Sequence, residues 1–143
     1  EDVAMVGIGS GGWVTTLVSA LDLNVKKSFS ISGTLPIALL GKDFRKSNSN
    51  YFEYAPSFYL RFNYLDLYLL SSNGIGRSHS QIYILNDPRR FSGMAYKLYA
   101  DDLIKLTETL ENTEFDFFED SSTLENNISK NILDFIHSKI ENK

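Results

Sequence analysis

The sequence contains no cysteine, which excludes disulfide bonds, cysteine-ligated zinc and a thiol nucleophile. No uninterrupted apolar run reaches the roughly 18 residues that a membrane-spanning helix needs. Positive charge is also scarce, because 14 Lys and Arg stand against 18 Asp and Glu. The resulting net charge of −4 provides no basic surface, so we expect no nucleic-acid partner.

Aromatic residues, in contrast, are abundant, with ten Phe and eight Tyr among 143 residues. This length predicts a single domain over residues 1–143 with a sizeable core. Strands that alternate with helices predict an α/β three-layer fold, a parallel sheet flanked by helices. The patterns predict strands over 4–8, 25–32, 80–85 and 114–118, helices over 13–21, 62–70 and 94–110, and a last helix near the C-terminus.

Apolar stripes predict which faces of the later helices are buried. The spacing of residues 94–110 places Tyr99, Leu103, Leu106 and Leu110 on one face. In the last helix the corresponding stripe is Ile128, Ile132, Ile136 and Ile140. Ser122 and Glu125 have the spacing of a capping box, which predicts that this helix begins just after Ser122.

Four glycines interrupt the chain between the first strand and the first helix: Gly7, Gly9, Gly11 and Gly12. A strand, a glycine turn and a helix together present backbone N–H groups at the edge of a sheet. Dinucleotide-binding folds use this arrangement, and so does the nucleophile elbow of α/β-hydrolases. A dinucleotide site also needs an acidic residue about 20 positions later. The next acid after the second strand is Asp43, in a polar loop, so dinucleotide binding ranks third among our interpretations.

An elbow requires small residues two positions before and after its tip. With Ser10 at the tip, the residue two positions earlier is the bulky Ile8. With Gly9 at the tip, Gly7 and Gly11 both satisfy the requirement. The better register therefore puts a residue without a side chain where a nucleophile would stand.

Residues 6–15, VGIGSGGWVT, resemble the nucleophile elbow of a group of bacterial α/β-hydrolase-fold proteins, which are serine esterase- or peptidase-like. Further agreement lies at residues 32–36, 64–69, 74–77 and 84–88. The resemblance implies that the four strands correspond to the last four of that fold, its C-terminal half. It also implies that the triad acid is Asp87 and that the histidine position is occupied by Asn126.

The chain thus departs from the family pattern at Gly9 and at Asn126. A Ser–His–Asp mechanism needs a hydroxyl and an imidazole, and neither position supplies one. The resemblance therefore implies a hydrolase-fold protein that is catalytically degenerate; a non-catalytic binding or assembly module is the alternative. If the chain is active, Ser10 is the remaining nucleophile, and the N–H groups of Ser10, Gly11 and Gly12 would help to hold the oxyanion.

No other residues replace the missing triad members. We interpret His79 as a surface loop residue at the start of the third strand, and His137 as a helix-surface or helix-packing residue. Glu119 and Asp120 are alternative candidates for the triad acid, but we interpret them as residues that cap a strand end. Carboxylates are scattered along the chain and no histidine pair has ligand spacing, so we expect neither a metal nor another cofactor. Asp101 with Asp102, and Asp116 with Glu119 and Asp120, are more often solvated faces than a magnesium site.

Residues 36–70 form a cap-like aromatic insertion, with eight aromatic side chains between Tyr51 and Tyr68. Two interpretations stay open: a helical cap packed on the sheet, or the lining of a pocket for a small apolar or acyl ligand.

The first strand would have an open edge, because nothing before it in the chain can pair with it. We expect self-association, a partner chain or a detached N-terminal half to cover that edge. Since the chain begins at Glu1, almost directly in a strand, we also expect it to be a processed or C-terminal part of something longer.

Overall fold

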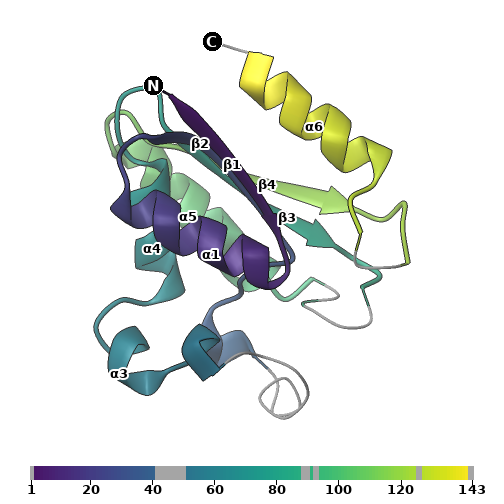
Figure 1. Cartoon of the computed structure of the whole chain (residues 1–143). Helices are drawn as coiled ribbons and strands as arrows, with labels where there is room; N and C mark the ends of the chain where they lie inside the picture. The colour runs from purple at the N-terminus through teal and green to yellow at the C-terminus, as the bar shows by residue number, and fades with distance from the viewer. Residues whose placement is uncertain (1, 41–50, 88–90, 92–93, 125–126, 142–143) are drawn as a thin grey trace.

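Four strands form one parallel sheet in the order β1-β2-β3-β4 (Figure 1). The computed structural model describes residues 2–40, 51–87, 91, 94–124 and 127–141. The strands are β1 (Val3–Ile8), β2 (Val25–Ile31), β3 (Ser78–Ile84) and β4 (Glu114–Asp120). Each lies within two residues of its predicted bounds.

Helices cover both faces of this sheet, so the predicted α/β three-layer fold is confirmed. One face carries α1 (Ser10–Leu21), α4 (Tyr64–Ser72) and α5 (Lys97–Thr109), which connect successive strands, and the other carries α6 (Lys130–Glu141) (Figure 1). Between β2 and α4 lie the short elements η1 (Ile37–Leu39), η2 (Tyr51–Glu53) and α3 (Pro56–Tyr59). No helix in the described ranges has the length and hydropathy to cross a bilayer.

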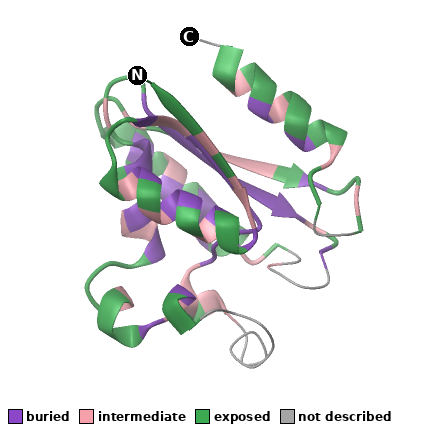
Figure 2. Ribbon diagram, viewed as in Figure 1, coloured by how far each residue is buried: buried purple, intermediate pink, exposed green. Residues whose placement is uncertain are grey.

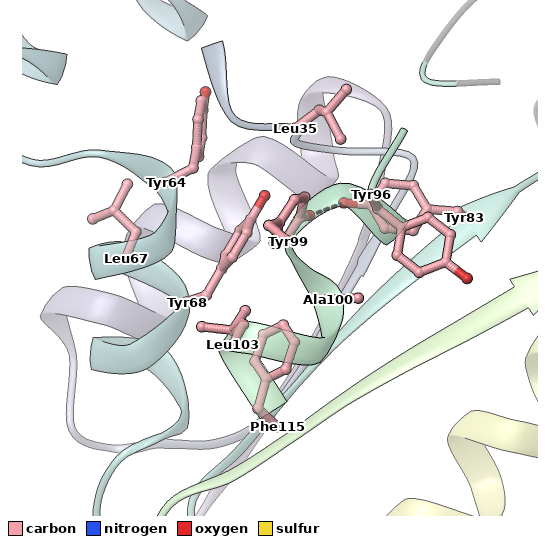
Figure 3. Close-up of a cluster of buried hydrophobic side chains, with 10 residues drawn as sticks. All are labelled: Leu35, Tyr64, Leu67, Tyr68, Tyr83, Tyr96, Tyr99, Ala100, Leu103 and Phe115. Carbon is pink, nitrogen blue, oxygen red and sulfur yellow. Dashed lines mark hydrogen bonds between the residues drawn. The ribbon is translucent and has the colours of Figure 1, made fainter. Parts of the chain in front are cut away.

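Two cores lie on the two faces of the sheet, because successive strand side chains point to opposite faces. The α6 side is mostly aliphatic and includes Phe29, Ile31, Ile82, Ile84, Ile132 and Ile136. The other side is rich in tyrosine and is shown in Figure 3: Leu35, Tyr64, Leu67, Tyr68, Tyr83, Tyr96, Tyr99, Ala100, Leu103 and Phe115. Every residue of β3 is buried, as Figure 2 shows, because this strand has neighbours on both sides and helices on both faces.

The buried face of α5 differs from the predicted stripe. Tyr99 and Leu103 are buried, but Leu106 is 45% exposed and Leu110, beyond the helix end, is 39% exposed. Ala100 and Thr107 are buried in their place. The helix is therefore turned so that Ala100 and Thr107, rather than Leu106, lie on the buried face beside Tyr99 and Leu103.

The start of α6 also differs from the prediction. The helix begins at Lys130 and not after Ser122, whose hydroxyl donates to Asp120 Oδ1 at 2.6 Å instead. The Ser129 Oγ accepts a hydrogen bond from the Ile132 N–H at 3.1 Å and caps the helix. Ile128 precedes the helix and is 40% exposed, and Ile140 is 42% exposed. Glu125, the other half of the predicted capping box, lies outside the described residues.

Candidate functional site

The turn between β1 and α1 is a single residue, Gly9. Its φ of 57° and ψ of −123° lie in a region that side chains disfavour. The Gly9 N–H donates to Ile31 O at 2.9 Å, and Gly9 O accepts the first helical hydrogen bond, from Trp13 N–H at 3.1 Å. The structure thus places Gly9 at the tip of the turn, with Ser10 one position into the helix.

Glycine contacts hold the helix close to the strand. A Cβ on Gly7 would lie 2.2 Å from Gly11 O and 2.5 Å from Thr15 Oγ1, so no side chain fits there. A Cβ on Gly12 would lie 2.8 Å from the Gly33 Cα, on the loop after β2. At Gly11, in contrast, an added Cβ meets no atom of the described residues within 4 Å. The prediction that Gly11 must be small is therefore wrong, and Gly12 has that steric role.

Ser10 bonds to a residue that the sequence analysis missed. Its Oγ donates to Glu53 Oε1 at 2.9 Å, across 43 positions of sequence. Ser10 is exposed, whereas Glu53 is only 3% exposed. The carboxylate lies at the positive end of α1, which favours a negative charge. Glu53 is the only acid between Asp43 and Asp66, and its isolation among aromatic residues was the one available signal of burial.

A chain of hydroxyl groups fastens the cap segment to α1. Trp13 Nε1 donates to Tyr59 OH at 2.8 Å, and Tyr59 OH lies 2.9 Å from Tyr64 OH. Tyr64 OH donates to the backbone oxygen of Glu53 at 2.7 Å, and the rings of Tyr59 and Tyr64 stack at 4.8 Å. Burial raises the pKa of both tyrosines, so both stay neutral. These contacts hold Glu53 above the start of α1.

An apolar pocket of about 280 Å³ lies between α1 and the cap. Trp13 and Leu17 form its α1 side, and the cap contributes Tyr51, Phe52, Ala55, Ser57 and Phe58. Trp13 lies one helical turn after Ser10, and Phe52 is next to Glu53 in sequence. The aromatic residues between Tyr51 and Tyr68 therefore have two different roles. Tyr64 and Tyr68 are in the core, and Tyr51, Phe52 and Phe58 line this pocket.

Asp87 lies at the same edge of the sheet as the Gly9 turn. In the pairing register Ile8 is opposite Ile31, and Ile31 is opposite Ile82, so the carboxyl ends of β1, β2 and β3 meet. Asp87 follows β3 by three residues and is fully buried. Because β1 and β3 are two strand spacings apart, their ends are separated by roughly 10 Å.

Asn126, the position that the resemblance assigns to the histidine, lies outside the described residues. The other triad positions lie at one edge of the sheet, but the first of them, Gly9, has no side chain. Within the described parts of the chain, no serine, histidine and acid come together as a triad.

His79 is not on the surface, so that prediction is wrong. It is the second residue of β3 and is fully buried, with its ring stacked on Tyr68 at 5.9 Å. Its Nδ1 lies 2.7 Å from Ser28 Oγ, and its Nε2 lies 2.8 Å from Gln81 Nε2. Burial, with the charge of Arg77 as a smaller cause, lowers the pKa of His79 to about 3. This neutral imidazole lies at the end of β3 opposite to Asp87 and is a core residue.

The remaining candidate groups lie on the surface or at strand ends. His137 is exposed on α6 and lies 3.0 Å from Glu141 Oε1, as a helix-surface residue would. Glu119 accepts from Lys97 at 2.8 Å and from Tyr96, contacts that lower its pKa. The buried Asp120 accepts from Ser122. Among the residues that the structure describes, no group of three His, Asp or Glu side chains could hold a metal ion.

Comparisons with models of known protein families, with curated proteins and with solved structures found no match.

Proposed function

We propose that this chain is a catalytically degenerate α/β-hydrolase-like domain, one that resembles serine ester and amide hydrolases but binds rather than cleaves its ligand. The strand order supports the proposal, because the resemblance implies four neighbouring parallel strands that begin at the elbow. The helix positions add support, since three crossover helices lie on one face and the last helix on the other.

One observation carries the proposal: Gly9 occupies the tip of the turn with φ 57° and ψ −123°. In an elbow this strained position holds the nucleophile above the sheet edge. Here no side chain projects from it, so the chemical step of a serine hydrolase has no attacking atom. The parts that bind, a helix N-terminus and an apolar pocket, are retained.

The ligand class follows from the pocket. Its volume of about 280 Å³ and its mostly aromatic and aliphatic lining suit a short acyl chain or a similarly small apolar group. Trp13 is the only tryptophan of the chain and lines this pocket, so its fluorescence reports binding there. We expect octanamide to change the emission of Trp13 saturably.

The matched variants are Ala55→Phe, which fills the pocket, and Leu98→Phe, at a leucine on α5 that is 75% exposed. The first should abolish the response to octanamide, and the second should leave it intact. No response in the wild type, or the same response in Ala55→Phe, would contradict a ligand site in this pocket.

A second candidate function is ester or amide hydrolysis through Ser10, and one contact favours it. Ser10 Oγ donates to a buried carboxylate oxygen of Glu53 at 2.9 Å, and a carboxylate in that position could accept the hydroxyl proton. A fluorophosphonate probe separates the two candidates. Labelling that is lost in both Ser10→Ala and Glu53→Gln would support hydrolysis, and an unlabelled wild type supports the degenerate domain.

Dinucleotide binding remains the third candidate. Its pyrophosphate would sit at the start of α1, where the Glu53 carboxylate now bonds to Ser10. Because two negative groups would compete for this place, we expect no thermal shift with NAD or FAD, and a clear shift would revive this candidate.

A further inference from the structure

One stretch of the chain has no charge. Residues 3–21 contain no Asp, Glu, Lys, Arg or His, although charged residues make up 22% of the chain. This stretch forms the whole of β1 and α1. Several of its apolar side chains are nevertheless exposed: Val3 by 44%, Val6 by 43%, Val14 by 38%, Val18 by 36% and Leu21 by 78%. A surface of this kind is typical of an interface.

The two edges of the sheet differ sharply. The β4 edge carries Glu114, Asp116, Glu119 and Asp120, and Lys139 and Lys97 pair with three of them. Charges on an edge strand are the usual protection against pairing with another chain. In the part of the chain that the structure describes, β1 pairs with β2 alone, and the strand contains no charge and no proline. Its one register irregularity lies at its first step, between Val3 and Ala4. This edge is therefore unprotected.

The outer face of α1 has a second feature of an interface. Gly11, Val14, Val18 and Leu21 are all exposed and follow one another at intervals of three, four and three residues. This spacing is that of the a and d positions through which helices pack in pairs. Trp13 and Leu17, which line the ligand pocket, lie on a neighbouring stripe. The free strand edge and the free helix seam belong to consecutive elements, so one partner can cover both.

We propose that a second copy of this chain covers this surface, with β1 pairing antiparallel to β1 of its partner about a two-fold axis. The two four-stranded sheets then join into one, and the seam on α1 packs against the same seam of the partner. Figure 2 shows that β1 is exposed or half-buried along its length and that parts of α1 are exposed.

Charge argues for a copy of the same chain. An uncharged surface neither selects an oppositely charged partner nor repels itself, so it is complementary to its own copy. This proposal does not depend on the proposed ligand site.

Light scattering coupled to gel filtration tests the proposal on the wild-type chain over a range of concentrations. We expect a mass twice that of the 16.2 kDa chain. Val6→Lys, on the strand edge, and Val18→Lys, on the helix seam, should each raise the dimer dissociation constant by about 100-fold or more, because both bury an unpaired charge. Leu98→Lys, at an exposed leucine on α5, is the control and should remain dimeric.

Hydrogen exchange supplies a second readout for variants that keep the circular dichroism of the wild type. The outward N–H groups of β1 should exchange slowly in the wild type and quickly in Val18→Lys, which changes only the helix. A wild type that is monomeric at every concentration would overturn the proposal. So would a dimer that survives both lysine substitutions, or a chain that pairs only with a different polypeptide.

Discussion

His79 is held neutral inside the sheet by its burial, and both of its ring nitrogens have hydrogen-bond partners. Gln81 Nε2 donates to its Nε2, so the imidazole proton is on Nδ1 and is donated to Ser28 Oγ. The Ser28 hydroxyl in turn donates to Ser78 O at 3.1 Å. Burial of the charged form, with the charge of Arg77 as a smaller cause, lowers the pKa of His79 to about 3. Protonation would also replace the acceptor at Nε2 with a second donor.

This histidine makes the fold sensitive to acid. In the unfolded chain a histidine titrates near 6.5, above the folded value of about 3, so the unfolded state binds more protons between these values. The free energy of unfolding therefore falls as the pH is lowered through that window. From His79 alone we expect the free energy of unfolding to fall by about 2 kcal/mol between pH 7 and pH 5.

Urea unfolding at pH 7 and at pH 5 checks this expectation. His79→Gln should lose this part of the pH dependence, whereas His137→Gln, at an exposed histidine, should keep it. An equally steep decline in His79→Gln would show that another group is responsible.

Gly7 and Gly11 make a second residue-scale comparison, because only one of them lacks space for a methyl group. Gly7→Ala should destabilise the fold by about 3 kcal/mol, since its Cβ would collide with backbone at 2.2 Å. Gly11→Ala should be neutral or stabilising by up to about 1 kcal/mol, since alanine favours the helix and the site is open. Denaturant unfolding of both variants measures the difference, and equal losses would be inconsistent with Gly7 as the close contact.

At the scale of elements, local pattern predicted the strands and most of the helices. β-branched and aromatic runs with glycine boundaries place a strand without knowledge of its neighbours. The predictions that were wrong concern features that depend on contacts with other parts of the fold. His79 was misplaced because β3 begins earlier than its apolar run, and its burial depends on α4. Which face of α5 is buried depends on how the helix packs against the rest of the domain. Where α6 begins depends on the hydrogen bond from the Ile132 N–H to Ser129 Oγ.

The candidate site was predictable only in its local part. The Gly9 turn follows from sterics within six residues, whereas the Ser10–Glu53 contact joins residues 43 positions apart. No periodicity relates such positions, so sequence alone could not pair them.

The cap is the element whose attachment matters most to the site. Tyr64→Phe removes the donor to Glu53 O and the partner of Tyr59 OH, and it leaves the ring stacking in place. We expect a loss of about 1–2 kcal/mol in unfolding free energy and a shift in Trp13 emission, because Tyr59 also accepts from Trp13. Tyr54→Phe, in the same cap but outside the lining of the Trp13 pocket, is the control for emission and stability. An unchanged spectrum in Tyr64→Phe would argue against this hydroxyl chain.

At the scale of the whole molecule, the chain combines a protected edge at β4, an unprotected edge at β1, and a site at the carboxyl ends of the strands between them. The uncharged stretch of sequence that forms β1 and α1 also contains the Gly9 turn. The structural role of that stretch, a tight strand-to-helix turn, is independent of whether its tip carries a nucleophile.

The central claim, that the turn has the shape of an elbow and lacks only its reactive groups, is tested by rebuilding them. Fluorophosphonate labelling, followed by mass spectrometry of the modified peptide, is measured on the wild type, on Gly9→Ser/Asn126→His and on the same double variant with Asp87→Asn added. The account predicts no labelling of the wild type, labelling at position 9 of the double variant, and loss of that labelling with Asp87→Asn. Labelling of the wild type at Ser10, or a folded double variant that stays unlabelled, would contradict it.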